Sequence, residues 1–227
     1  MTAASIRART RAQLTAEIKT VARRHLAEQG PGLSLRAVAR DLDMAPSALY
    51  RYFDGRDELL TALIIDAYDS VGAAAERAAA TSGSYAQRCL GISQSVRHWA
   101  LAHPHEWALI YGSPIPGYAA PQDTNRAAAR GALALGGVVS EAFSAGCVQA
   151  AAPLSGTLGD EAQALAEERL PGLPGQVVAR VLGAWLQLCG AVSAEIFGQL
   201  QGTIDAREDF LEFQMRGAIA WVGLEGG

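Results

Sequence analysis

The 227-residue sequence is short of lysine, cysteine and charge. Lys19 is its one lysine, so arginine supplies nearly all of the nineteen basic residues. The three cysteines, Cys89, Cys147 and Cys189, are too few and too scattered for a disulfide framework, and no CxxC pair exists. We therefore interpret each cysteine as a small, buried hydrophobic side chain.

Long apolar runs and a signal peptide are also missing. No uninterrupted stretch approaches the roughly 18–20 apolar residues needed to cross a bilayer, and the first residues turn basic without a hydrophobic stretch behind them. We therefore expect a cytoplasmic protein without a membrane partner. Hydrophobic residues make up 50% of the chain and charged residues 19%, which supplies a substantial core and argues against disorder.

The usual catalytic and nucleotide-binding signatures are absent: HExxH, GxSxG, a Walker loop and a glycine-rich nucleotide fingerprint. His98, His103 and His105 lie near Glu106, but Pro104 interrupts the helix between them, so their spacing does not bring metal ligands together. We expect no catalytic residue, no metal site and no cofactor.

Charge is distributed unevenly along the chain. Residues 1–40 contain eight basic and two acidic residues, a net charge of +6, whereas the whole chain carries −4, which leaves −10 for the remainder. A basic end joined to an acidic body is typical of a phosphate-binding module attached to a second domain.

Helical spacing recurs throughout, and no segment shows the period-two alternation of a strand. An Ala-, Pro- and Gly-rich stretch over 148–159 predicts a crossing loop. The expected fold is all-α, with an N-terminal three-helix helix-turn-helix domain over 1–55 and a C-terminal helical bundle over 56–227. The expected helices cover 8–29, 34–42, 46–52, 56–80, 85–102, 104–112, 122–147, 160–169, 176–200 and 206–222.

Residues 35–53 have the spacing of a helix-turn-helix. Ala39 is small where two steeply crossing helices touch. Asp43 is a residue type that tolerates the left-handed conformation needed in the turn. Leu49 and Phe53 then face inward, one turn apart.

The outer face of the second helix carries side chains suited to DNA. Pro46 fixes the helix start, so that its N-terminal end can enter a major groove, and Ser47 can bond a base edge or a phosphate. Arg51 can reach a guanine edge, where a bidentate contact contributes about 1–3 kcal/mol of discrimination. Tyr50 and Tyr52 suit phosphates, which fix position rather than sequence.

Ser34 and Arg36 start the preceding helix, where the N-terminal amides and the helix dipole favour a phosphate. A helix–turn–helix corner inside an ordinary bundle has the same geometry, so this motif alone does not decide the function.

The wider sequence resembles the DNA-binding domain of the TetR family of repressors. The resemblance lies in residues 18–30, 33–39 and 49–60, the last of which is LYRYFDGRDELL. It implies a homodimer that reads a palindromic operator and is released by a small ligand bound in the C-terminal domain.

Carried over residue by residue, the resemblance assigns DNA contacts. Arg56 stands where the family often has a phosphate-binding lysine. Asp43 replaces the family's common glycine, and Ala45 replaces its common capping serine. Pro46-Ser47-Ala48 replaces the family's lysine-glycine-threonine. Because of these differences, the operator sequence cannot be inferred from the family. The residues that match DNA contacts are Ser34, Arg36, Pro46, Ser47, Tyr50, Arg51, Tyr52 and Arg56.

The two apolar helices expected over 176–200 and 206–222 fit either a dimer interface or an internal core. The resemblance implies that they pack against their mates in a four-helix interface. The expected interface residues are Val177, Val181, Trp185, Leu188, Val192, Phe210, Phe213, Gly217 and Trp221.

A ligand pocket is expected among the helices of 84–147 and 176–200. The apolar supply suggests a largely hydrophobic ligand with one or two polar anchors, although each bulky candidate could equally be a core residue. Residues 103–114 resemble the subgroup of the family that carries a WHG domain. The candidates for the pocket wall are Trp99, Trp107, Tyr111, Phe143, Trp185 and Phe197.

The sequence therefore predicts a regulator that binds double-stranded DNA, most simply a homodimeric repressor released by a small, largely apolar effector. Three alternatives stay open: a metal- or redox-sensing repressor that uses C-terminal histidines or cysteines, an adaptor that has lost DNA binding, and an activator. An enzyme is not expected.

Overall fold

A computed structural model describes residues 3–30, 32–149 and 152–224. Every named element in these ranges is an α-helix, which confirms the all-α prediction. The chain forms two compact units. Unit 1 comprises Met1–Ala67 and His105–Thr124, and unit 2 comprises Tyr68–Pro104 and Asn125–Gly227. These units divide the chain elsewhere than at the expected boundary after residue 55.

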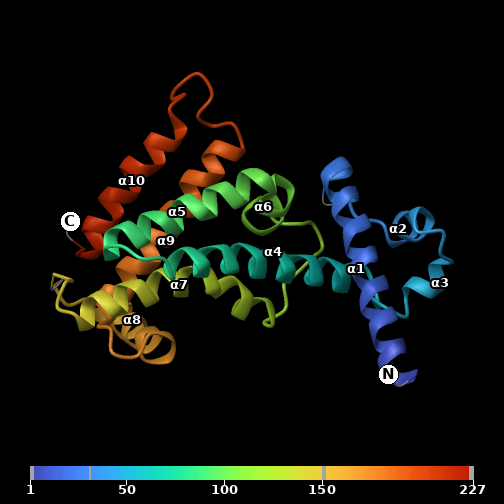
Figure 1. Cartoon of the computed structure of the whole chain (residues 1–227), viewed down its shortest axis with the longest axis horizontal. Coiled ribbons are helices and arrows are strands. Elements are labelled where there is room, and N and C mark those ends of the chain that lie inside the picture. Colours follow the sequence, from blue (N-terminus) through green and yellow to red (C-terminus); the bar gives the residue numbers. More distant parts are fainter. Residues whose placement is uncertain (1–2, 31, 150–151, 225–227) are drawn as a thin grey trace. The chain divides into compact units, whose positions relative to one another are not determined.

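Unit 1 contains the N-terminal helices and a later segment that packs on them. Figure 1 shows α1, α2 and α3 grouped together, and α2 contacts both α1 and α3. The elements of this unit are α1 (Ala3–Gln29), α2 (Leu35–Asp41), α3 (Pro46–Leu49), the first part of α4 (Arg56–Ala79) and most of α6 (Pro104–Tyr111).

One hydrophobic cluster holds unit 1 together. From the later segment, Leu109, Ile115 and Tyr118 pack against it, and the hydroxyls of Tyr118 and Thr61 lie 2.8 Å apart. Apolar side chains of α1, α2 and α4 all meet here. The buried members are Ile18, Ala22, Leu26, Leu33, Leu35, Val38, Ala39, Leu49, Phe53, Leu59, Leu60 and Leu63.

Unit 2 is built around α9, which packs against α8, α10 and α5. Helix α5 begins with a capping box, in which Ser84 and Gln87 each bond the other's backbone N–H, an arrangement that satisfies two orphan donors. The elements of unit 2 are the rest of α4, α5 (Tyr85–Ala102), α7 (Thr124–Ser144), α8 (Gly156–Arg169), α9 (Gly175–Ile196) and α10 (Arg207–Val222).

Helix α9 is apolar for its length. Among the described residues it is the one helix that is long and apolar enough, by length and composition alone, to cross a membrane, with a mean hydropathy of 1.5. Its buried side chains, which include Val181, Leu188 and Val192, pack inside unit 2. Burial in the core of this unit accounts for that part of the apolar composition.

Five helix boundaries differ by three residues or more from the expected ones. Helix α7 ends at Ser144 rather than at residue 147, and α9 ends at Ile196 rather than at residue 200. Helix α1 begins at Ala3 rather than at residue 8, and α8 begins at Gly156, so part of the expected crossing loop is helical. Residues 150–151 of that loop lie outside the described residues. Helix α3 ends at Leu49 instead of residue 52, because the next N–H groups bond carbonyls only three residues back.

Ion pairs between distant residues join the helices of unit 2. Arg97 of α5 binds Glu195 of α9 through two N–H groups, at 2.7 and 2.8 Å. Arg130 of α7 binds Asp69 and Glu76 of α4, both at 2.6 Å. The hydrogen bonds from Arg130 hold the pKa of Glu76 below its usual value.

Candidate functional sites

The helix-turn-helix of unit 1 has the turn that the sequence predicts. Asp43 adopts the left-handed conformation, with φ 52°. The turn is closed by the N–H of Met44, which donates to the carbonyl of Ala39 at 2.9 Å. Ala39 and Leu49 are fully buried where α2 and α3 meet. The inward side of the motif is therefore set by small and apolar side chains.

The expected DNA contacts occupy the surface of unit 1. Ser34 caps α2, since its hydroxyl accepts the N–H of Ala37, and Tyr50 is 48% exposed. Tyr52 and Arg56 are half-buried. The remaining expected contacts are all exposed: Ser34, Arg36, Pro46, Ser47 and Arg51.

The polar contacts within unit 1 that the sequence did not predict include two that involve α1. Arg11 donates from Nη2 to the carbonyl oxygen of Arg51 at 3.0 Å, and its guanidinium lies 5.4 Å from the centre of the Tyr52 ring. The second contact joins α1 to α2 through His25 and Asp41, whose Nε2 and Oδ2 atoms are 2.8 Å apart.

His25 is buried, at 3% exposure, and its contact with Asp41 gives Nε2 a partner in the interior. Its Nδ1 atom is buried without a hydrogen-bond partner among the described residues. Arg24 also donates to the same carboxyl oxygen, at 2.9 Å. The hydrogen bonds from His25 and Arg24 lower the pKa of Asp41 below its usual value. The position of His25, one turn after Val21 on the inward stripe of α1, was the available sequence signal.

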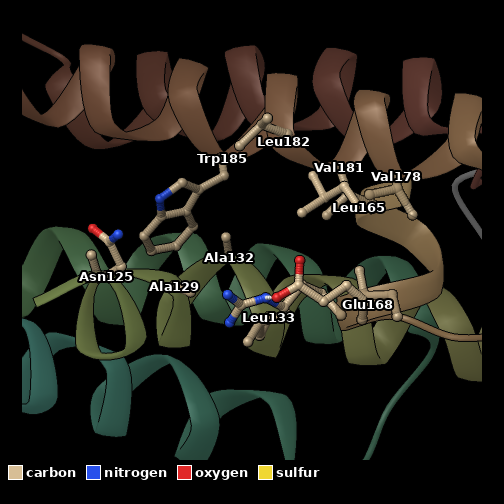
Figure 2. Close-up of a pocket in the computed structure, with 13 residues that line it drawn as sticks. Asn125, Ala129, Ala132, Leu133, Leu165, Glu168, Val178, Val181, Leu182 and Trp185 are labelled. Atoms are coloured by element: carbon tan, nitrogen blue, oxygen red, sulfur yellow. Dashed lines mark ion pairs between the residues drawn. The ribbon is translucent and has the colours of Figure 1, made fainter. Parts of the chain in front are cut away.

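Unit 2 contains a cavity of about 410 Å³ between α7, α8 and α9. Figure 2 shows side chains of α9 on one wall, including Trp185 and Val181, and those of α7 opposite, including Ala129 and Ala132. The lining is mostly aliphatic. Its residues are Asn125, Ala128, Ala129, Ala132, Leu133, Leu165, Glu168, Arg169, Leu170, Val178, Val181, Leu182 and Trp185.

The small residues of α7 leave this space open. Ala128, Ala129 and Ala132 present only methyl groups to the cavity. Gly131 allows the closest approach, because a Cβ there would lie 2.2 Å from the Trp185 ring. Any larger residue at Gly131 would therefore displace the indole.

Polar groups in the cavity lining are few. Arg169, the last residue of α8, pairs with Glu168 through an Nε–Oε1 distance of 2.9 Å. Asn125 stands near the start of α7, and Figure 2 places it away from Glu168, with the apolar wall between them. The arrangement suits an apolar molecule with a polar group at an end.

The structure disperses the aromatic residues that we expected around one pocket. Only Trp185 belongs to the cavity lining. Trp99 is buried and donates to the Ser70 hydroxyl at 2.9 Å. Trp107 and Tyr111, both in unit 1, contact each other with their ring planes tilted by 40° and their centroids 4.4 Å apart. Two further candidates lie outside that lining: half-buried Phe143 and exposed Phe197.

The nine expected interface residues separate into two groups. Phe210 is half-buried, while Phe213, Gly217 and Trp221 of α10 are exposed. The other five are buried within unit 2. They are Val177, Val181, Trp185, Leu188 and Val192.

Cysteines and histidines do not assemble into a candidate metal site. Within residues 3–30, 32–149 and 152–224, no three His, Cys, Asp or Glu side chains cluster as ligands would. Burial raises the pKa of the Cys89 thiol to about 12. Cys189 is also buried, and Cys147 is exposed. No observation therefore favours the metal- or redox-sensing alternative.

An exposed, partly basic recognition segment on a buried helix-turn-helix core defines a DNA-binding regulator as the class of this protein. Comparison with known proteins gives the same class. Residues 18–63 match the bacterial regulatory proteins of the tetR family, and residues 90–218 match the tetracyclin repressor-like C-terminal domain. The chain belongs to the TetR family of transcriptional regulators, which are not enzymes.

Individual relatives agree with this assignment. HTH-type transcriptional regulators of Mycobacterium tuberculosis and Mycobacterium bovis are 38% identical to this chain over 197 residues, which cover 83% of this chain and of each relative. The crystal structure of a protein described as regulatory, SCO4313, matches with a TM-score of 0.75 at 35% identity and covers 93% of this chain and 98% of its own. A tetR-family protein from Rhodococcus RHA1 shares the fold, with a TM-score of 0.63, 16% identity and coverage of 93% and 98%.

Proposed function

We propose that this regulator is a homodimeric repressor, acting in the cytoplasm, that binds a palindromic operator and is released by a small, largely apolar effector. The aliphatic cavity of unit 2 is the observation that supports binding of an effector. The eight residues expected to contact DNA support binding of an operator.

Arg51 and Ser47 are the residues that we assign to base edges. Both are exposed on the segment that begins with Pro46. An arginine that binds a guanine edge through two hydrogen bonds discriminates against the other bases. Tyr50 and Arg36, also exposed, are assigned to phosphates, which position the protein on the duplex without reading its sequence.

The dimer interface that we propose is the exposed apolar face of α9 and α10. Leu182 and Leu186 of α9 are 42% and 61% exposed, and Phe213 and Trp221 of α10 are 73% and 52% exposed. A Cβ at Gly217 would meet no atom within 4 Å, which leaves room for a partner helix. Dimerisation is typical of the family, and a two-fold dimer pairs the same face with itself.

The proposed effector occupies the cavity between α7, α8 and α9. An aliphatic wall favours an apolar body, and the side chains available to hold a polar end are Asn125 and Arg169. Release from DNA requires that the effector bind the state without DNA more tightly than the DNA-bound state. A tenfold preference corresponds to about 1.4 kcal/mol.

Selection from random duplex DNA tests the operator part. We expect an enriched palindrome, bound with an affinity that falls steeply as salt is raised. Enrichment of no sequence would contradict operator binding.

Effector binding is tested with the purified protein and a panel of apolar molecules that differ in their polar end. Trp185 lies in the cavity wall, so bound molecules should change tryptophan emission and should dissociate the enriched DNA. Ala132→Leu, which fills the cavity, should abolish both responses while operator affinity stays unchanged. Ala134→Leu is the matched control, because it makes the same change on α7 outside the cavity lining. Equal responses in the two variants would rule out this cavity.

The dimer is tested by light scattering of the eluting protein. Phe213→Glu places a charge on the exposed face of α10 and should yield a monomer. Leu158→Glu is the control, since Leu158 of α8 is 59% exposed but outside that face. A wild-type protein that elutes as a monomer at micromolar concentration would contradict the proposed dimer.

A further inference from the structure

The N-terminal end of α1 extends beyond the part of the chain that matches the TetR family. The match begins at residue 18, whereas α1 begins at Ala3. The first acidic residue of the chain is Glu17. This extension is therefore basic, and Arg9 and Arg11 are exposed on it.

Arg11 joins the extension to the end of the recognition segment. Its Nη2–H donates to the carbonyl oxygen of Arg51 at 3.0 Å, across 40 positions of sequence. Its guanidinium carbon also lies 5.4 Å from the centre of the Tyr52 ring, within the range of a cation–π interaction. A single side chain thus contacts two consecutive residues that we assign to DNA.

The recognition segment needs such a contact because its helix is short. Helix α3 has four residues, and the last carbonyls of a helix lack partners within it. The carbonyls of Ala48 and Leu49 accept the N–H groups of Arg51 and Tyr52, at 3.3 and 2.9 Å. Beyond these turns, the carbonyl of Arg51 is held by Arg11.

We propose that Arg11 is a positioning residue for DNA recognition, which fixes the end of the recognition segment and so sets how Arg51 and Tyr52 meet the operator. This inference rests on the proposed base contact of Arg51. Arg11 is exposed and is not a member of the hydrophobic cluster of unit 1. Its removal should therefore alter recognition without unfolding the unit.

Arg9 provides a matched control on the same helix. It has the same charge, is also exposed, and lies roughly 160° from Arg11 around the helix axis. A residue that acts only through its charge weakens binding to all DNA alike. A positioning residue changes the preference for operator over random DNA.

The experiment compares the full-length wild type with Arg9→Ala, Arg11→Ala, Arg51→Ala and the double variant Arg11→Ala/Arg51→Ala. Fluorescence anisotropy gives affinities for the selected operator and for random duplex. We expect Arg11→Ala to lower the operator preference about three- to tenfold, the size of one hydrogen bond. Arg9→Ala should leave that preference unchanged. In the Arg51→Ala background, removal of the Arg11 side chain should have no further effect on the preference for operator over random DNA.

Amide hydrogen exchange in the free protein supplies a readout that does not depend on DNA. Arg11→Ala should speed exchange at Arg51 and Tyr52, whereas Arg9→Ala should not. Equal losses of affinity for both DNAs in the two single variants would overturn the proposal, and so would unchanged exchange in Arg11→Ala. Full additivity with Arg51→Ala would overturn it as well.

The inference and the proposed function fail in different ways. If the wild type prefers no DNA sequence, both the operator function and the recognition role of Arg11 are contradicted. This holds even if amide exchange at Arg51 responds to Arg11→Ala. A wild type with a clear preference that Arg11→Ala does not change leaves the operator function intact and removes only the role of Arg11.

Discussion

Unit 1 and unit 2 carry their candidate functions in opposite ways. In unit 1 the important groups are side chains that project outward, such as Arg51 and Tyr50, from a short motif with fixed spacing. In unit 2 the important feature is a cavity. Helix α7 leaves this space open because Ala129 and Ala132 have small side chains. A short motif is enough to present a side chain to solvent, whereas the cavity of unit 2 requires three helices, α7, α8 and α9, to pack around it.

The helix-turn-helix and unit 2 differ in the sequence range of the contacts that hold them. The helix-turn-helix is closed by neighbours, such as Met44 and Ala39. Unit 2 depends on pairs far apart in sequence, such as Arg97 and Glu195. Substitutions can test how far this contrast extends.

The largest effect is expected for Arg97→Ala in unit 2. Glu195 is 9% exposed, and the loss of its partner would leave a buried carboxylate without its cation. Breaking a buried pair on one side costs about 3–5 kcal/mol. Urea unfolding should show this loss, while Arg97→Met/Glu195→Leu should recover most of it. A loss below 1 kcal/mol in Arg97→Ala would mean that the long-range pairs do not hold unit 2.

Leu49→Ala tests the local core of unit 1. Leu49 is fully buried between α2 and α3, and such truncations cost about 2–5 kcal/mol. Urea unfolding measures the change, and operator binding should weaken with it because α3 loses its anchor. Leu158→Ala, at a 59% exposed site, is the control and should stay within about 0.5 kcal/mol of wild type.

Arg51→Ala should separate recognition from stability. We expect a loss of about 1–3 kcal/mol in discrimination at one operator position, with unfolding in urea unchanged because Arg51 is exposed. Anisotropy on the operator and on its single-base variants measures the loss. A uniform weakening on every variant would assign Arg51 to a phosphate instead of a base.

Acid should affect unit 2 more than unit 1. The pKa values of Glu76 and Glu141 in unit 2 are lowered by hydrogen bonds from Arg130 and Arg88, and that of Asp41 in unit 1 by His25. A carboxyl with a lowered folded-state pKa contributes stability that is present above its unfolded value and is lost as pH falls through the folded one.

The ordinary pKa is 4.5 for glutamate and 3.8 for aspartate, so the stability that these contacts contribute should decline as pH falls below these values. Unfolding free energies from pH 5 to pH 2 should decline less steeply in Glu76→Gln/Glu141→Gln than in the wild type. Asp41→Asn should change the slope less. The reverse order would place the acid-sensitive contacts in unit 1.

The smallest effect is expected for alkylation of the cysteines. Cys147 is exposed, whereas Cys89 and Cys189 are buried, so iodoacetamide should label one site in the native protein. Mass spectrometry identifies that site, and operator affinity should not change. Cys147→Ser should remove the labelling. Loss of DNA binding on labelling would instead favour a redox-sensing repressor.

The helix-turn-helix could be predicted from sequence because its requirements are local. Ala39 had to be small, Asp43 had to accept a left-handed backbone, and both conditions appear within a few residues. The end of α3 was placed too late, since the apolar pattern continues to Phe53 whereas the hydrogen bonding changes after Leu49.

The cavity could not be predicted because the residues that create it have ordinary reasons to occur in a helix. Alanine is the best helix former, so Ala128 and Ala132 give no sign of a space beside them. The large aromatic residues instead suggested a pocket wall, yet Trp107 and Trp99 are buried outside the cavity lining. The size of an aromatic side chain predicts that it is buried, but not which helices bury it.

The alanine-rich wall of α7 has a practical consequence for biosensor engineering. Exchange of Ala128, Ala129 or Ala132 for serine, or truncation of Leu133 at the same wall, would reshape the cavity by one or a few atoms at a time. None of these positions belongs to unit 1. A library at these four codons would therefore vary the proposed effector site while the reporter promoter, designed once around the selected DNA sequence, is kept for every variant.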